Sequence, residues 1–274
     1  MEKEKIVSII NEVRKNVPLV HNITNYVTVN DCANAILAIG ASPIMADDIM
    51  EAADITSISA ALVINIGTLN KRTVESMIAS GKKANELGIP VVFDPVGAGA
   101  SDFRNETTKR ILTEVKVDII RANLSEMSFI AGLKVATKGV DSSEADASNN
   151  ADEVAENAAK MYNCVTAITG ATDVVSDGTR LVKLSNGVKL LSRVTGTGCM
   201  TSALVGAFAG AAADSGQYDY LHAACAGIAS MSIAGELAYE TSAEIGTGSF
   251  HIGIIDNLSK IDEKTLTEKI KMKE

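Results

Sequence analysis

The sequence predicts an α/β fold in which one mostly parallel sheet is covered by helices on both faces. Short runs rich in Val and Ile alternate with longer segments of helical spacing along most of the 274 residues. The runs are apolar at nearly every position, as in strands buried on both faces, and strands that alternate with helices form parallel sheets. Hydrophobic residues make up 46% of the chain, which is enough for one large core. We therefore expect a single domain over residues 1–274.

Start and stop signals place the elements of the first half. The charged segment 1–15 has isoleucines at helical spacing, which predicts an amphipathic first helix. Apolar runs predict strands at "PLVHNIT" (18–24), "SPIM" (42–45), "ALVINIG" (61–67), "PVVFDPV" (90–96) and "VDIIRANL" (117–124). Helices are expected between them at 30–39, after Asp47, at 71–87, at 107–115 and from Ser125. Gly40 and Gly88 end two of these helices.

The second half continues this pattern and adds an antiparallel edge. The polar segment 139–160 leads into a helix, and the strand "CVTAITG" (164–170) follows without a Pro/Gly linker. Residues 173–192 carry Asp-Gly and Asn-Gly between short apolar runs, which predicts antiparallel hairpins at one edge of the sheet. Two long helices rich in small residues and a C-terminal helix complete the chain.

Charge and cysteine content exclude several classes of protein. The net charge of −9 argues against nucleic acid or an anionic membrane as the main partner. The four cysteines are widely spaced without a Cys-x-x-Cys pair, which fits reduced cytosolic thiols better than disulfides or a zinc site. The apolar stretches 199–213 and 221–238 are too short or too polar to be membrane spans, and the first helix is no signal peptide. We expect a cytoplasmic protein with no membrane partner.

Polar residues follow the predicted strands, and ligands of open α/β sheets bind beyond the carboxyl ends of the strands. Asp94, Arg121, Asn123 and Glu126 follow two consecutive strands in "VVFDPVGAGAS" and "IIRANLSEM". Two carboxylates and an amide suit a hydrated Mg²⁺ held partly by nucleotide phosphates, and the arginine offers a fork for phosphate oxygens. The alternative is a buried ion pair of Asp94 or Arg121 that only organises the sheet.

A glycine-rich turn in "VTGTGCMTSA" (194–203) is the second candidate site. Gly196 and Gly198 open a predicted helix, where free backbone N–H groups and the positive end of the helix dipole favour an anion such as a phosphoryl group in transfer. The alternative is a helix capped by Thr195 or Thr197, with the glycines present for close packing. The motifs of P-loop NTPases and Rossmann dehydrogenases are both missing.

Five stretches together resemble the hydroxyethylthiazole kinase family of the ribokinase-like superfamily. They are "PLVHNITNYVTVNDCANAILAIGASPIMADD", "ALVINIGTL", "VVFDPVGAGAS", "IIRANLSEM" and "VTGTGCMTSALVGAF". The resemblance covers about residues 18–255. It implies a ribokinase-like fold without a separate lid domain, and transfer of the ATP γ-phosphoryl group to 5-(2-hydroxyethyl)-4-methylthiazole in thiamine salvage, with Mg²⁺. It also implies a homotrimer whose thiazole pocket lies at a subunit boundary.

The same resemblance implies a role for each matching residue. The thiazole site would be lined by Asn25, Met45, Gly67, Thr195 and Gly196. Contacts with ATP would come from Arg121, Asn123 and Thr169, with the metal near Asp94 and Glu126. Gly196 and Gly198 would form an anion hole, and Cys199 would stand where most ribokinase-like enzymes place a catalytic aspartate. On sequence alone Met45 fits a core position almost equally well.

One residue departs from the family pattern. The family usually has glycine between the arginine and the asparagine of "RGN-x-SE", whereas this chain has Ala122. If that position needs a positive φ or a close backbone approach, alanine would shift Arg121 and Asn123. The departure therefore bears on the ATP site.

Cys199 is interpreted as the general base of the transfer. A helix N-terminus lowers the pKa of a thiol from about 8.5, which predicts a useful thiolate fraction near neutrality. The loose transition state of phosphoryl transfer needs positioning more than a strong base. The alternatives are a small packing residue, or a nucleophile for acyl transfer paired with His21, His222 or His251.

Three other functions fit parts of the pattern. The first is a kinase for another small alcohol, such as a pyrimidine, sugar or pyridoxal relative. The second is a nucleotide-responsive regulatory protein that has lost turnover, and it would bind ATP without releasing ADP. The third is a thiol hydrolase, which would form an acyl adduct at Cys199 without ATP.

Overall fold

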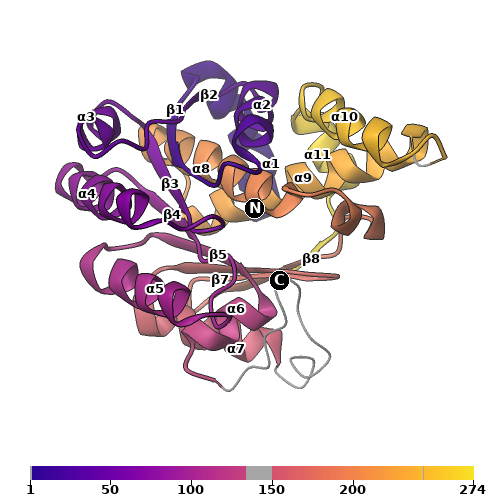
Figure 1. Cartoon of the computed structure of the whole chain (residues 1–274). Helices are drawn as coiled ribbons and strands as arrows, with labels where there is room; N and C mark the ends of the chain where they lie inside the picture. The colour runs from indigo at the N-terminus through magenta and orange to yellow at the C-terminus, as the bar shows by residue number, and fades with distance from the viewer. Residues whose placement is uncertain (1, 134–149, 243) are drawn as a thin grey trace.

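A twisted sheet runs through the molecule, and in the computed structural model the part of the chain that is described, residues 2–133, 150–242 and 244–274, contributes nine strands to it (Figure 1). Their spatial order is β2-β1-β3-β4-β5-β6-β7-β8-β9. The strands are β1 (Leu19–Ile23), β2 (Ser42–Ile44), β3 (Ala61–Asn65), β4 (Val91–Asp94), β5 (Ile119–Asn123), β6 (Val165–Thr169), β7 (Asp173–Ser176), β8 (Leu181–Leu184) and β9 (Met272–Lys273). Pairs from β2 to β6 are parallel and the rest are antiparallel, which confirms the predicted sheet.

Helices cover both faces of the sheet and enclose two hydrophobic cores. One core lies under α1 (Glu2–Asn16), α2 (Val29–Ile39), α8 (Thr197–Ser215), α9 (Tyr220–Ser242), α10 (Thr247–Leu258) and α11 (Glu263–Lys269). The other lies under α3 (Ala52–Ser57), α4 (Lys71–Leu87), α5 (Asp102–Glu114), α6 (Leu124–Ile130) and α7 (Ala151–Tyr162). Figure 1 shows α4 and α8 on opposite sides of the strands. The α/β prediction with helices on both faces is therefore confirmed.

Local signals explain several helix ends. Gly40 and Gly88 adopt left-handed conformations, with φ of +101° and +72°, and end α2 and α4 as predicted. Helix α5 begins at Asp102 and not at 107, because the Ser101 side chain accepts a hydrogen bond from the Arg104 backbone N–H and caps it. The helix expected within 139–160 is described from Ala151, and residues 139–149 lie outside the described part of the chain.

The prediction of a second hairpin is wrong. Asp177 and Gly178 turn the chain between β7 and β8, but Asn186 and Gly187 lead into the 3₁₀-helix η2 (Lys189–Arg193). The second neighbour of β8 is instead β9, from the far end of the sequence. The Asn186 side chain joins this pairing, since its Oδ1 accepts a hydrogen bond from the Lys271 backbone N–H at 2.7 Å.

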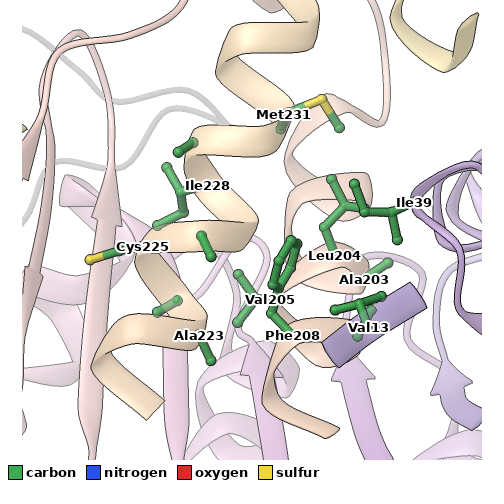
Figure 2. Packing of buried hydrophobic residues seen from close by; sticks show 14 of the residues in the cluster. Val13, Ile39, Ala203, Leu204, Val205, Phe208, Ala223, Cys225, Ile228 and Met231 are labelled. Carbon is green, nitrogen blue, oxygen red and sulfur yellow. The ribbon is translucent and has the colours of Figure 1, made fainter. Parts of the chain in front are cut away.

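The two small-residue helices α8 and α9 are core helices, as predicted. Helix α9 is long and apolar enough to cross a membrane by length and composition, but most of it is buried inside the protein. Figure 2 shows Val205 of α8 on the side that faces α9 and Leu204 beside Ile39 of α2, all within the first core. The close approach of α8 and α9 depends on Gly227, where an ideal Cβ would lie 2.8 Å from the Val205 backbone nitrogen.

Substitution at Gly227 should therefore destabilise the fold. We expect Gly227→Ala to lower the free energy of unfolding by about 1–3 kcal/mol, because the backbone of α8 would have to move away. Gly248→Ala is the matched control: Gly248 is also helical, but a Cβ there meets nothing within 4 Å, so it should be neutral or stabilise by up to about 1 kcal/mol. Urea unfolding measures both variants. Equal effects at the two glycines would contradict the packing argument.

Candidate active site

The carboxyl ends of the parallel strands meet the first turn of α8, which carries Cys199. Gly196 precedes this helix with φ of +88° and has no side chain to cap it. The Thr197 hydroxyl donates to the carbonyl oxygens of Leu191 and Val194, behind the turn. The alternative of a threonine-capped helix is therefore wrong. The first N–H groups of any helix lack acceptors within it, so this turn can receive an anion.

A buried network of side chains surrounds Cys199. The Nδ2 groups of Asn25 and Asn65 lie 3.2 and 3.3 Å from the Cys199 sulfur. The same Asn65 group donates to Asp94 Oδ2 at 2.8 Å, and the Ser202 hydroxyl donates to that oxygen at 2.7 Å. Asn65 and Asp94 are directly paired in the register of β3 and β4. The structure thus joins the predicted thiazole residue Asn25 to Cys199 and to the predicted metal ligand Asp94.

Three glycines lie close to side chains around this network. An ideal Cβ on Gly67 would lie 2.9 Å from Asn25 Nδ2, and one on Gly196 would lie 2.7 Å from Thr28 Cγ2. A Cβ on Gly198 would lie 2.9 Å from Arg121 Nη1. Each distance is shorter than real Cβ contacts allow. A side chain at Gly67 or Gly196 would displace Asn25 or Thr28, whereas at Gly198 the flexible end of Arg121 would have to move.

The environment of Cys199 changes the expected direction of its pKa shift. Burial raises the pKa of the thiol, and the negative charge of Asp94 raises it further. Hydrogen bonds from Thr28, Asn25 and Asn65 lower the pKa, but by less than burial raises it. The prediction of a thiol pKa lowered by the helix end is therefore wrong, because burial outweighs it.

None of the three histidines, all of which the structure describes, is hydrogen-bonded to Cys199. His21 is buried between the Thr56 hydroxyl and the Ala46 carbonyl oxygen. His222 contacts Glu2, and His251 lies 3.2 Å from Asp31. A thiol hydrolase with a Cys–His pair therefore has no support in this geometry.

Arg121 lies between the network and a cavity of about 670 Å³. One of its terminal nitrogens donates to the Thr169 hydroxyl, and another lies 3.7 Å from Asp94 Oδ2. Its Nε is buried, and no partner for it lies among the residues described. The ion pair considered from the sequence is therefore present, but Arg121 also faces the cavity.

The cavity has the size of a site for a nucleotide or similar ligand. The predicted ATP residues Arg121, Asn123 and Thr169 line it together with Gly198. Sequence reasoning missed the part of the wall near the antiparallel edge and on α9, which includes Asp173, Asn186, Gly187, Lys189, Leu191, Ile228 and Met231. Burial raises the pKa of Asp173 to about 6, although the Gly170 backbone N–H donates to its carboxylate.

Asn123 and Glu126 form a capping box at the start of α6. The Asn123 side chain accepts from the Glu126 backbone N–H, and the Glu126 carboxylate accepts from the Asn123 backbone N–H at 2.9 Å. The other Glu126 oxygen accepts from the Gly97 backbone N–H at 2.7 Å. Burial, together with the charge of Asp94, raises the pKa of Glu126 to about 7. Glu126 thereby ties the turn after β4 to the end of β5.

The residues described contain no group of three or more His, Cys, Asp and Glu side chains able to hold a metal ion. Asp94 is fully buried, and its Oδ1 has no hydrogen-bond partner in the described structure. Burial raises the pKa of Asp94, and Arg121 opposes this. An unpaired buried carboxylate oxygen fits one contact with a cation, with phosphates and water supplying the other ligands.

Two predicted thiazole residues stand apart from the network. Met45 is half-buried and packs against the first core, and Thr195 is exposed just before Gly196. The hydrogen bonds described around Cys199 do not include either residue.

Ala122 is an ordinary residue of β5. It is fully buried, it pairs with Ile168, and its φ is not positive. The alanine therefore requires no strained backbone between Arg121 and Asn123.

Sequence reasoning missed Ser202 and Arg104. Ser202 follows Cys199 by three residues on α8, so helical spacing could have found it. Arg104 donates to the carbonyl oxygens of Ile66, Val96 and Gly67 at 2.6, 2.6 and 2.8 Å. It thereby binds the turn after β3 to the turn after β4. No signal in the charged helix α5 distinguishes this arginine from its neighbours.

Comparison with known proteins gives the family of this chain. The sequence matches the hydroxyethylthiazole kinase family over residues 10–264. It is 65% identical to a hydroxyethylthiazole kinase of Clostridium beijerinckii, with 98% of this chain and 97% of the relative covered. A solved hydroxyethylthiazole kinase from Pyrococcus horikoshii OT3 is 41% identical and superposes with a TM-score of 0.87 over 98% of both chains. A ribokinase-like protein from Enterococcus faecalis V583, 9% identical with a TM-score of 0.62 over 91% of this chain and 89% of its own, shares the fold.

Proposed function

Because this chain belongs to the hydroxyethylthiazole kinase family, we propose that it transfers the γ-phosphoryl group of ATP to the hydroxyl of 5-(2-hydroxyethyl)-4-methylthiazole. One structural observation supports this reaction. The first turn of α8 stands between the cavity lined by Arg121 and the network that holds Cys199. ATP on one side and the alcohol on the other would then meet at Gly198.

ATP would lie in the cavity with its phosphates toward Arg121 and Thr169. Arginine offers two parallel N–H donors to phosphate oxygens. The N–H groups at the start of α8, with Gly196 and Gly198 in place of side chains, would receive the phosphoryl group as it moves. We expect Asn123 to shape the cavity wall, since its side chain already caps α6.

The alcohol would lie beside Asn25 and Gly67, within reach of Cys199. Its oxygen attacks the γ-phosphorus, the bond from phosphorus to the β–γ bridging oxygen breaks, and ADP leaves. The proton of the alcohol passes to the thiolate form of Cys199, which becomes the neutral thiol. The buried thiol has a raised pKa, so little thiolate is present at neutral pH. In a loose transition state the proton leaves the alcohol late, so a small fraction of thiolate is sufficient.

Mg²⁺ would be held by the free Oδ1 of Asp94 and by ATP phosphates. When bound, it neutralises charge on the phosphates during transfer. Both Glu126 oxygens already accept hydrogen bonds from backbone N–H groups. We therefore propose that Glu126 lies near the metal and that its role is to keep the Gly97 turn in position.

The product would enter thiamine salvage in the cytoplasm, and the enzyme would act as a homotrimer. Exposed apolar side chains support a subunit boundary beside the thiazole site. Tyr26 and Val27, next to Asn25, are 78% and 55% exposed, and Met50 is 86% exposed in the segment that follows Met45. A partner subunit that covered them would also close the pocket over the alcohol.

The test is product formation from the thiazole alcohol and Mg-ATP, followed by mass, with a control lacking thiazole to detect ATP hydrolysis. A phosphorylated thiazole is the expected product, and its loss on chelation of Mg²⁺ would support the metal. ATP binding without any phosphorylated alcohol would contradict the proposal. Phosphorylation of a different alcohol in a substrate panel would correct the substrate.

Arg104 offers a prediction within this proposal. Arg104→Met removes charge-assisted hydrogen bonds to the turn that carries Gly67, so we expect the KM for the alcohol to rise about tenfold or more. The KM for ATP should change much less. Arg110→Met on the same helix is the control, because Arg110 pairs with the surface carboxylates of Glu75 and Glu114. Steady-state kinetics with each substrate varied decides it, and equal rises in both KM values would contradict this role.

A further inference from the structure

Asn65 is the centre of the network around Cys199. It is the last residue of β3 and is 1% exposed. Its Oδ1 accepts from the Gly67 backbone N–H at 2.8 Å and from Asn25 Nδ2 at 3.1 Å. Its Nδ2 donates to Asp94 at 2.8 Å and lies 3.3 Å from the Cys199 sulfur. One amide therefore contacts the alcohol side, the base and the buried carboxylate.

Backbone contacts fix which way the two asparagine amides point. The Gly67 N–H can only donate, so the Asn65 atom that faces it must be the oxygen, and Nδ2 must face Cys199 and Asp94. The same logic holds for Asn25, whose Oδ1 accepts from the Thr28 backbone N–H at 3.1 Å. The Cys199 sulfur is thus faced by N–H donors from two different strand ends.

We propose that Asn65 is a positioning residue of the phosphoryl transfer, whose amide holds the Cys199 sulfur beside Gly67 and stabilises the negative charge of the thiolate. The inference rests on Cys199 as the general base. A sulfur that takes a proton from the alcohol must first be anionic, and hydrogen bonds from N–H donors favour that state. Burial and Asp94 act in the opposite sense, so the amide donors offset part of their effect.

A double-mutant cycle on kcat tests this role. We expect Asn65→Ala to lower kcat by about 10- to 100-fold in the wild type, the scale of a lost hydrogen bond to a charged group. In the Cys199→Ala background, where the sulfur is gone, the same substitution should lower kcat by no more than about threefold. A residue that only supports the fold would show its full effect in both backgrounds, and that result would overturn the proposal.

Asn22→Ala is the matched control. Asn22 is also 1% exposed, on the neighbouring strand β1, but its side chain donates to the Val20 carbonyl oxygen and its Oδ1 has no partner in the described structure. Its removal should change kcat less than about threefold and equally in both backgrounds. If Asn65→Ala does not fold, Asn65→Ser takes its place, since a hydroxyl can still accept from the Gly67 N–H.

Alkylation of Cys199 by iodoacetamide separates this inference from the proposed catalytic role. We expect Asn65→Ala to slow modification of Cys199 at pH 7.5 about tenfold, read by peptide mass, because alkylation needs the thiolate. Asn22→Ala should leave the rate unchanged. If alkylation slows in Asn65→Ala but Cys199→Ala keeps the kcat of the wild type, Asn65 holds the sulfur and Cys199 is not the general base. If Asn65→Ala changes neither the rate of alkylation nor kcat, the inference itself is wrong.

Discussion

Cys199→Ala is expected to lower kcat by about 10²- to 10⁴-fold at saturating ATP and thiazole alcohol, the scale of a lost general base. The KM values should change little, because the sulfur acts on the reacting hydroxyl and not on the body of either substrate. Cys164→Ala is the control, since Cys164 is a buried thiol just before β6, at the opposite end of the strand from Thr169. Product formation by mass measures all of these variants. An unchanged kcat in Cys199→Ala would contradict the base role.

The pH profile gives a second reading of Cys199. The raised pKa of the thiol means that its thiolate fraction grows with pH through the neutral range, so the kcat of the wild type should rise with pH. Cys199→Asp should retain activity, because the resemblance to ribokinase-like enzymes implies an aspartate at this place. Its carboxylate is ionised at lower pH than a thiol, so the rise should move to lower pH. A rise that stays the same in both proteins would assign it to another group.

Arg121→Ala is expected to raise the KM for ATP by about 10- to 100-fold or more, as the loss of a charged fork to phosphate implies. It should also lower the melting temperature, because Asp94 would lose the nearest cation in a fully buried place. Arg121→Lys keeps the charge and loses the fork. It should therefore restore stability more than affinity for ATP. An effect of Arg121→Ala confined to the thiazole alcohol would contradict its nucleotide role.

The sequence was sufficient for strands β1 to β6, because each carries its own apolar run, and for the ends of α2 and α4, where Gly40 and Gly88 are the stop signals. It failed at Asn186 and Gly187, where a local turn signal is overridden by pairing between β8 and β9. That pairing joins segments far apart in the chain. Only the folded sheet reveals it, together with the part of the cavity wall that follows β8.

In the candidate site, too, local signals could be predicted and contacts between distant segments could not. The rule of strand ends found Asp94, Arg121, Asn123 and Glu126, since it needs only the position of each strand, and the family resemblance supplied Asn25 and Gly67. It could not show Asn65 as the centre of the network, because the register of β3 against β4 brings its amide to Asp94. The pKa of Cys199 was predicted in the wrong direction because burial and the charge of Asp94 come from separate segments.

Gly67, Gly196 and Gly198 have a consequence for the evolution of this enzyme. Each is a position where any other residue would place an atom against Asn25, Thr28 or Arg121. In a gene copy released from selection, a side chain at Gly67 or Gly196 would displace Asn25 or Thr28, so we expect such a change to lower turnover while the rest of the fold persists. A relative that lacks Gly67 or Gly196 is therefore expected to have a disturbed site, whereas Ala122, which fits its strand without strain, gives no such expectation.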